Sequence, residues 1–97
     1  MSTETKRIEL HLDSDPRLAA AVGGAVRYLA EAAGLPEEVS REFQCEALEA
    51  CLKLFHSPSA STHVVDLLVY SDRLEVVLDG ASGGSAVRLT RSVVPHH

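Results

Sequence analysis

A chain of 97 residues is long enough for one domain with its own core and too short for two, and its net charge of −5 excludes the basic footprint that binds nucleic acid. It has no apolar run of the roughly 18 residues that a membrane span needs, so no contact with a membrane is expected. Residues 1–6 are polar, lack the apolar stretch of a signal peptide and are expected to be flexible. These features predict a cytoplasmic protein.

The first two predicted elements are a strand and a helix. Polar and apolar side chains alternate through residues 7–12, a pattern typical of a strand with one buried face. Ser14 or Asp15 can cap the helix that follows, because the side-chain oxygen of either residue can accept a bond from a free backbone N–H. Gly23 and Gly24 lower the intrinsic stability of this helix, which favours a close approach to the sheet or to the next helix over a hinge.

A second helix is predicted to begin within residues 35–38, and its apolar rows extend to Phe55. Apolar residues form two rows along it and cover much of its circumference, so it is expected to be the most buried helix. Cys45 and Cys51 lie six residues apart on this helix, which places them roughly 240° apart around its axis and prevents a disulfide between them. Neither cysteine has a histidine at zinc-binding spacing. Both are expected to be small buried hydrophobic residues, and no metal site is predicted.

The remaining segments favour strands. Residues 63–70 are rich in Val and Leu and are predicted to form a strand that is buried on both faces. A turn at residues 71–73 leads into a second strand at residues 74–78, and a glycine-rich connection follows. Residues 85–94 fit either a strand or a helix, and their β-branched side chains favour the strand.

These elements predict a single domain, residues 1–97, of the α+β class. The expected architecture is a two-layer sandwich in which two helices cover one face of a sheet. The four strands are expected to form a mixed, mostly antiparallel sheet, and the elements follow the order β-α-α-β-β-β.

Three segments and their spacing resemble motifs of one family. Residues 46–52 look like a helix that carries a Glu-x-x-x-Asn box, and residues 73–79 look like a strand that ends in an adenine-contacting Asp. Residues 83–89 are similar to a closing Gly-Gly-Thr-x-Val-x-Leu strand. Their order resembles the ATP-binding domain of the GHKL (histidine-kinase-like) superfamily, and within it the anti-sigma-factor serine kinases. The resemblance covers most of the chain and implies a nucleotide site.

The resemblance implies roles for five residues. Glu49 takes the position of the general base, and Lys53 stands where Asn would bind magnesium, although an ammonium group has no lone pair for a metal. We expect Lys53 to form a helix ion pair with Glu49 in preference to a phosphate contact. Asp79 matches the residue that accepts a bond from the adenine amino group, or it caps a turn. Ala81 replaces a glycine of the adenine box, and Gly83 matches the last glycine.

The chain departs from the family between the adenine box and the closing strand. Family members carry a lid and a further helix there, whereas only a few residues separate Asp79 from Ser85. A triphosphate in this site would lack the backbone N–H groups that normally hold it. The resemblance therefore implies a vestigial nucleotide site, and no cofactor is expected: tight binding of ATP and magnesium is not predicted.

Three functions remain open, and whether the chain is an enzyme is part of the question. We favour a non-catalytic GHKL-like regulatory module that binds a protein partner, such as a sigma factor or an antagonist in a partner-switching circuit. The second function is a serine/threonine protein kinase of the anti-sigma-factor type with weak residual activity, using Asp79 and Glu49. The third is a small structural homodimer.

Overall fold

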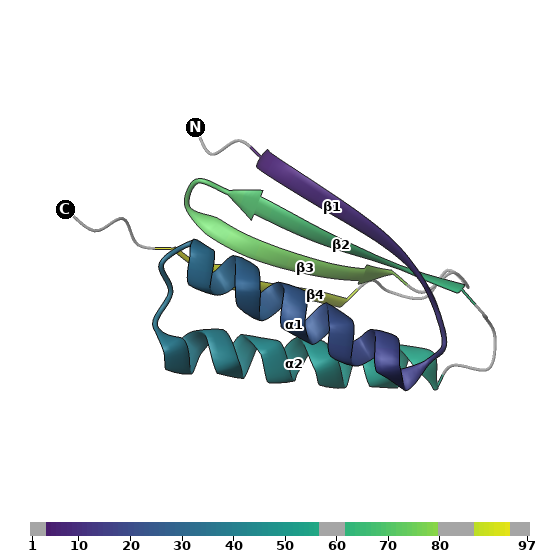
Figure 1. The fold of residues 1–97 in the computed structure, drawn as a ribbon. Coiled ribbons are helices and arrows are strands. Elements are labelled where there is room, and N and C mark those ends of the chain that lie inside the picture. The colour runs from purple at the N-terminus through teal and green to yellow at the C-terminus, as the bar shows by residue number, and fades with distance from the viewer. Residues whose placement is uncertain (1–3, 57–61, 80–86, 94–97) are drawn as a thin grey trace.

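The computed structural model describes residues 4–56, 62–79 and 87–93 (Figure 1). Its elements are β1 (Glu4–Asp13), α1 (Pro16–Ala32), α2 (Glu37–Phe55), β2 (Thr62–Tyr70), β3 (Arg73–Asp79) and β4 (Val87–Ser92). The α+β class and the order β-α-α-β-β-β are therefore confirmed, as is the strand predicted in the ambiguous segment near the C-terminus. Residues 4–6, which we expected to be flexible, belong to β1, because the long strand β2 offers backbone partners as far as Tyr70.

The strands form one sheet in the order β1-β2-β3-β4, and each of the three pairings between described strands is antiparallel. The expectation of a mixed sheet is therefore wrong: the described strands form a purely antiparallel sheet. The two helices are close to each other in length, so the chain runs out along α1 and returns along α2 to the end of the sheet where β1 stopped. β2 therefore starts beside the end of β1 and runs antiparallel to it.

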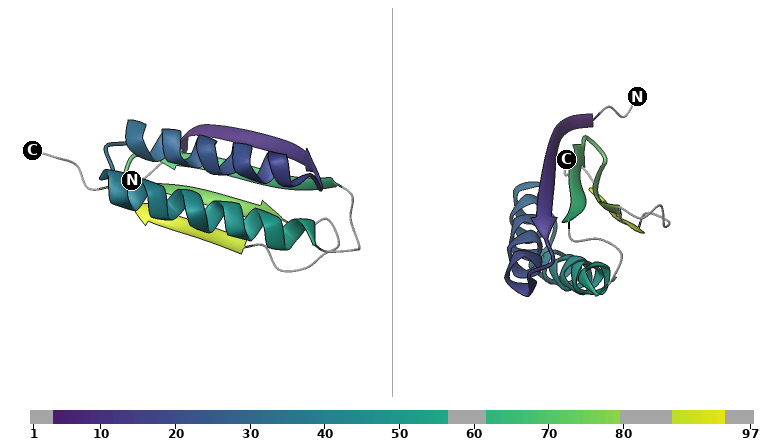
Figure 2. Two further views of the ribbon diagram at one scale, coloured as in Figure 1. Left: turned by 60° about the horizontal axis from the view of Figure 1, so that its bottom comes forward. Right: turned by 90° about the vertical axis from the view of Figure 1, so that its right-hand side faces the viewer.

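Both helices lie on the same face of the sheet, as predicted (Figures 1 and 2). α2 packs against β3 and β4, whereas α1 packs along α2 on the side of β1 (Figure 2). Apolar side chains from the strands meet those of the helices in a single core, whose fully buried members include Phe43, Val65, Leu67, Leu74, Val76 and Leu78. This core is the aliphatic interior that the composition implies.

Only one face of β2 is buried, which contradicts the prediction of burial on both faces. His63, Val65 and Leu67 point into the core, while the residues that alternate with them are half-buried. The face opposite the helices instead carries ion pairs between strands. On it, the carboxylate of Glu75 is 5% exposed and lies 3.0 Å from the Arg88 guanidinium. The aliphatic stem of Arg88 can lie over its surroundings while its guanidinium reaches water, and in this position it shields the Glu75 carboxylate from solvent.

Local signals in the sequence fix both ends of α1. The Asp15 carboxylate accepts a hydrogen bond of 2.9 Å from the backbone N–H of Arg17, so Asp15, not Ser14, is the N-cap. At the other end Gly34 has φ of +91°, a conformation that favours glycine. The Leu35 N–H then reaches back to the Ala30 carbonyl at 3.0 Å, closing the helix with the bond pattern of a Schellman motif.

Ser14 has a different role, in a polar contact at the edge of the core. Its Oγ lies 2.8 Å from Nε2 of His63, which is fully buried at the start of β2. The ring centroid of Phe55, at the end of α2, lies 5.2 Å from that of His63. Three segments that are far apart in the sequence are thus held together at one end of the molecule.

The prediction that α2 is the most buried helix is wrong. Four of its residues are buried, against five in the shorter helix α1. One of the two apolar rows of α2 consists of Cys45, Leu48, Leu52 and Phe55. It turns partly toward solvent: Leu48 and Leu52 are half-buried and Cys45 is exposed. The prediction of two buried cysteines therefore holds for Cys51 alone. α2 lies at the margin of the two-layer structure, so one of its flanks has no neighbour among the described residues.

Replacing each of the two adjacent glycines of α1 with alanine should change the stability of the protein in opposite directions. A Cβ on Gly23 would lie 3.3 Å from the carbonyl oxygen of Gln44 in α2, whereas a Cβ on Gly24 would meet nothing within 4 Å. Gly24→Ala is expected to raise the free energy of unfolding by about 1 kcal/mol through helix propensity. Gly23→Ala is expected to lower it, because the overpacked backbone of α2 cannot yield as a side chain can. Urea denaturation measures both, and equal stabilisation would contradict the close helix contact.

The two thiols should also differ in reactivity. Burial raises the pKa of the Cys51 thiol to about 11, so little thiolate forms at pH 8, while Cys45 is exposed. A disulfide reagent such as DTNB is expected to modify one thiol of the native protein quickly and the second only on unfolding. Cys45→Ser should remove the fast reaction. Fast modification of both thiols in native protein would be inconsistent with the burial of Cys51.

Candidate functional site

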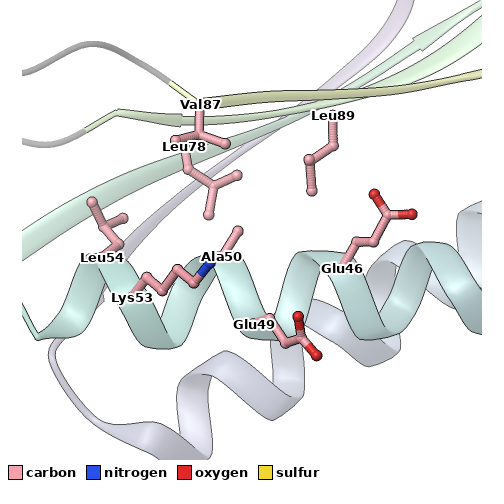
Figure 3. Close-up of a pocket in the computed structure, with 8 residues that line it drawn as sticks. All are labelled: Glu46, Glu49, Ala50, Lys53, Leu54, Leu78, Val87 and Leu89. Atoms are coloured by element: carbon pink, nitrogen blue, oxygen red, sulfur yellow. The ribbon is translucent and has the colours of Figure 1, made fainter.

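A cleft of about 480 Å³ opens between α2 and the strands β3 and β4 (Figure 3). We refer to it as the α2–β4 cleft. Its lining comes from one helix and two strands, and consists of Glu46, Glu49, Ala50, Lys53, Leu54, Leu78, Val87 and Leu89. Its volume lies within the range typical of ligand and side-chain binding pockets.

Regular periodicity places these residues together. On α2, steps of three and four residues bring Glu46, Ala50 and Lys53 to one side of the helix. On the sheet, Leu78 and Val87 are direct partners across β3 and β4, and Leu89 lies two residues further along the same face. The sheet side of the cleft is therefore aliphatic, and the charged groups come from the helix.

Glu46 has an ionic partner within the chain. Its carboxylate pairs with the guanidinium of Arg91, and the same guanidinium lies 4.9 Å from the ring centroid of Phe43. Figure 3 shows the Glu46 side chain directed toward the strands. Glu46 thus joins α2 to β4 at one end of the cleft, and its charge is balanced.

Glu49 and Lys53, which the resemblance assigns to the nucleotide site, both line this cleft. The predicted ion pair between them is wrong, because no ion pair joins them and both side chains are exposed. In Figure 3 the Glu49 carboxylate points away from the strands, while Lys53 lies along the helix. An exposed pair one helical turn apart gains only about 0.3–0.5 kcal/mol, too little to hold two long side chains together against their rotamer entropy.

The structure says less about the other three predicted site residues, Asp79, Ala81 and Gly83. Asp79 is the last residue of β3, and its backbone lies opposite that of Val64. Its role toward adenine stays a prediction. Ala81 and Gly83 lie outside the residues that the structure describes.

The sequence did not reveal Arg91 at the end of the cleft, or that Val87 and Leu89 line it. Arg91 lies 45 residues from Glu46, so no local spacing could reveal their ion pair. Val87 and Leu89 carried a signal, because they alternate with polar residues on a predicted strand. What was missing was the knowledge that α2 lies beneath that strand.

The described residues that line the cleft do not fit a magnesium nucleotide. Lys53 holds the position that would ligate the metal, and its ammonium group has no lone pair to offer. The strands contribute only aliphatic side chains to the cleft, where a triphosphate needs N–H donors. In the described parts of the chain, no group of three or more His, Cys, Asp or Glu residues could hold a metal ion. None of the helices described is both long and apolar enough to cross a membrane.

Comparison with known proteins gives no assignment. No protein-family model matches the chain, and no curated protein matches it. The likeness to the GHKL superfamily therefore rests on the three sequence segments described above.

Removing Arg91 should destabilise the protein more than removing its partner. Arg91→Ala loses both the ion pair and the contact with the ring of Phe43, and is expected to lower the free energy of unfolding by about 1 kcal/mol. Glu46→Ala loses only the ion pair and should cost about half as much. Urea denaturation of both single variants and the double variant measures the difference. A larger loss for Glu46→Ala would contradict the two-part role of Arg91.

Proposed function

We propose that this chain is a non-catalytic, GHKL-like regulatory module that binds a protein partner through the α2–β4 cleft. One observation carries the proposal: the helix position that the resemblance assigns to the metal ligand, Lys53, opens onto a cleft whose strand side is formed by Leu78, Val87 and Leu89. An apolar cleft with a charged rim favours aliphatic side chains of a protein over a hydrated triphosphate.

The charges of the cleft support a protein partner further. Two carboxylates and one ammonium group line it, and the Glu46 carboxylate is neutralised by Arg91. The remaining Glu49 carboxylate would repel a triphosphate, and a single Lys53 cannot offset three phosphates. A protein surface can instead place its own charges opposite Lys53 and Glu49 and put an apolar side chain between them.

The resemblance suggests the class of partner. Anti-sigma-factor kinases act on proteins of a partner-switching circuit, so a cytoplasmic sigma factor or an antagonist is the partner we propose. A degenerate site suits a regulator that binds without phosphorylating. For the alternative of a residual serine kinase, Glu49 would have to act as general base, and its carboxylate points away from the strands (Figure 3).

Calorimetric titration with ATP and ADP, with and without magnesium, tests the proposal. We expect no heat of binding and no thermal shift at millimolar nucleotide, because Lys53 provides no metal ligand and the strand side of the cleft is aliphatic. The control is Asp79→Asn, which should behave as the parent protein does. Micromolar binding that Asp79→Asn abolishes would overturn the proposal and support the kinase alternative.

A further inference from the structure

We propose that the partner that occupies the α2–β4 cleft is a second copy of this chain, which pairs its own β4 antiparallel to β4 and extends the sheet to eight strands. This inference rests on the proposed function, because it takes the α2–β4 cleft as a protein-binding surface. In the isolated protein the cleft is assigned to a second copy, which a sigma factor or an antagonist of the proposed circuit would have to displace. Four features of β4 and α2 support it.

The first feature is a free sheet edge beside the cleft. In the described parts of the chain, β4 pairs with β3 alone, and none of those parts pairs with the backbone groups on its outer edge. Val87, at the start of this strand, has 46% of its surface exposed although it is one of the aliphatic residues that line the cleft. An edge with exposed apolar side chains is a template for another strand, and the cleft beside it can take side chains from that strand.

The second feature is that β4 is complementary to itself. In a two-fold pair centred on Leu89, Val87 of one copy lies opposite Arg91 of the other, and Arg88 lies opposite Thr90. No two like charges face each other directly in this register. Leu89 meets its own counterpart on the face that carries the cleft, which places apolar side chains at the centre of the contact.

The third feature is the position of α2 under the sheet. α2 packs against both β3 and β4 and runs along them (Figure 1). Joining two β4 strands therefore sets the two α2 helices about two strand spacings apart, which is roughly 9.6 Å at about 4.8 Å per spacing. Packed helices lie about 8–10 Å apart. The helices can thus pack across the junction and close both clefts without any movement of either layer.

The fourth feature is the charge pattern of α2. Its polar row begins with acidic residues, Glu42, Glu46 and Glu49, and ends with Lys53. The two α2 helices run antiparallel across the junction, so each Lys53 falls opposite the acidic part of the other row. Lys53, which forms no ion pair with another of the described residues, thereby gains carboxylate partners from the second copy.

Sedimentation velocity, from low micromolar to several hundred micromolar protein, tests this proposal. We expect a species of twice the 10.4 kDa chain mass. Val87→Lys places a lysine opposite Arg91 of the second copy and should raise the dimer dissociation constant about 100-fold. Lys53→Glu should raise it by about tenfold. The matched control is Ile8→Lys, which changes a residue of similar exposure (41%) on the other sheet edge and should leave the constant unchanged.

Hydrogen exchange of the parent protein tests the same contact without any substitution, so a variant that fails to fold cannot affect the result. Amides of residues 87–92 should become more protected as the protein concentration rises, and those of β1 should not. A parent protein that stays monomeric, or a dimer that Ile8→Lys disrupts and Val87→Lys does not, would overturn the proposal. If the protein is monomeric and no nucleotide binds in the same samples, the proposal of a second copy is wrong but the cleft still binds a different protein. If a nucleotide binds, the proposed function itself is wrong.

Discussion

The close contact between α1 and α2 is the constraint on which the rest of the structure depends. Gly23 has no side chain, and this absence lets the backbone of α2 approach α1 at Gln44. Two helices packed side by side return the chain to the end of the sheet from which it left. β2 can then pair with β1 although two helices separate them in the sequence, and the helix pair covers the apolar face of the sheet that results.

The same arrangement creates the cleft. The helix pair covers the sheet so that α2 lies under β3 and β4, and β4 is the last described strand. β4 is the edge of the described sheet, and aliphatic residues of β4 and charged residues of α2 face a common opening there. Arg91 closes one end of this opening through Glu46 and Phe43.

Lys53 distinguishes a nucleotide site from a protein-binding surface in this cleft. A metal-dependent phosphoryl transfer needs an oxygen or nitrogen lone pair at the metal position, and an ammonium group has none. For contact between proteins the same charge is useful, because it sets the register of a partner that carries carboxylates. Val87 and Leu89 then supply the apolar contact area. The ammonium group of Lys53, which cannot bind a metal, therefore suits the proposed protein-binding surface.

Local patterns in the sequence determined the elements. Strand alternation, the Asp15 cap and the glycine after α1 act within a few residues of each other, so the order of the elements and the α+β class could be predicted. The tertiary structure decided which surfaces meet. The exposure of Cys45, the half-burial of one face of β2 and the pairing of Glu46 with Arg91 depend on neighbours distant in the sequence. Spacing along a helix shows which side chains share a face, but only packing decides what that face contacts.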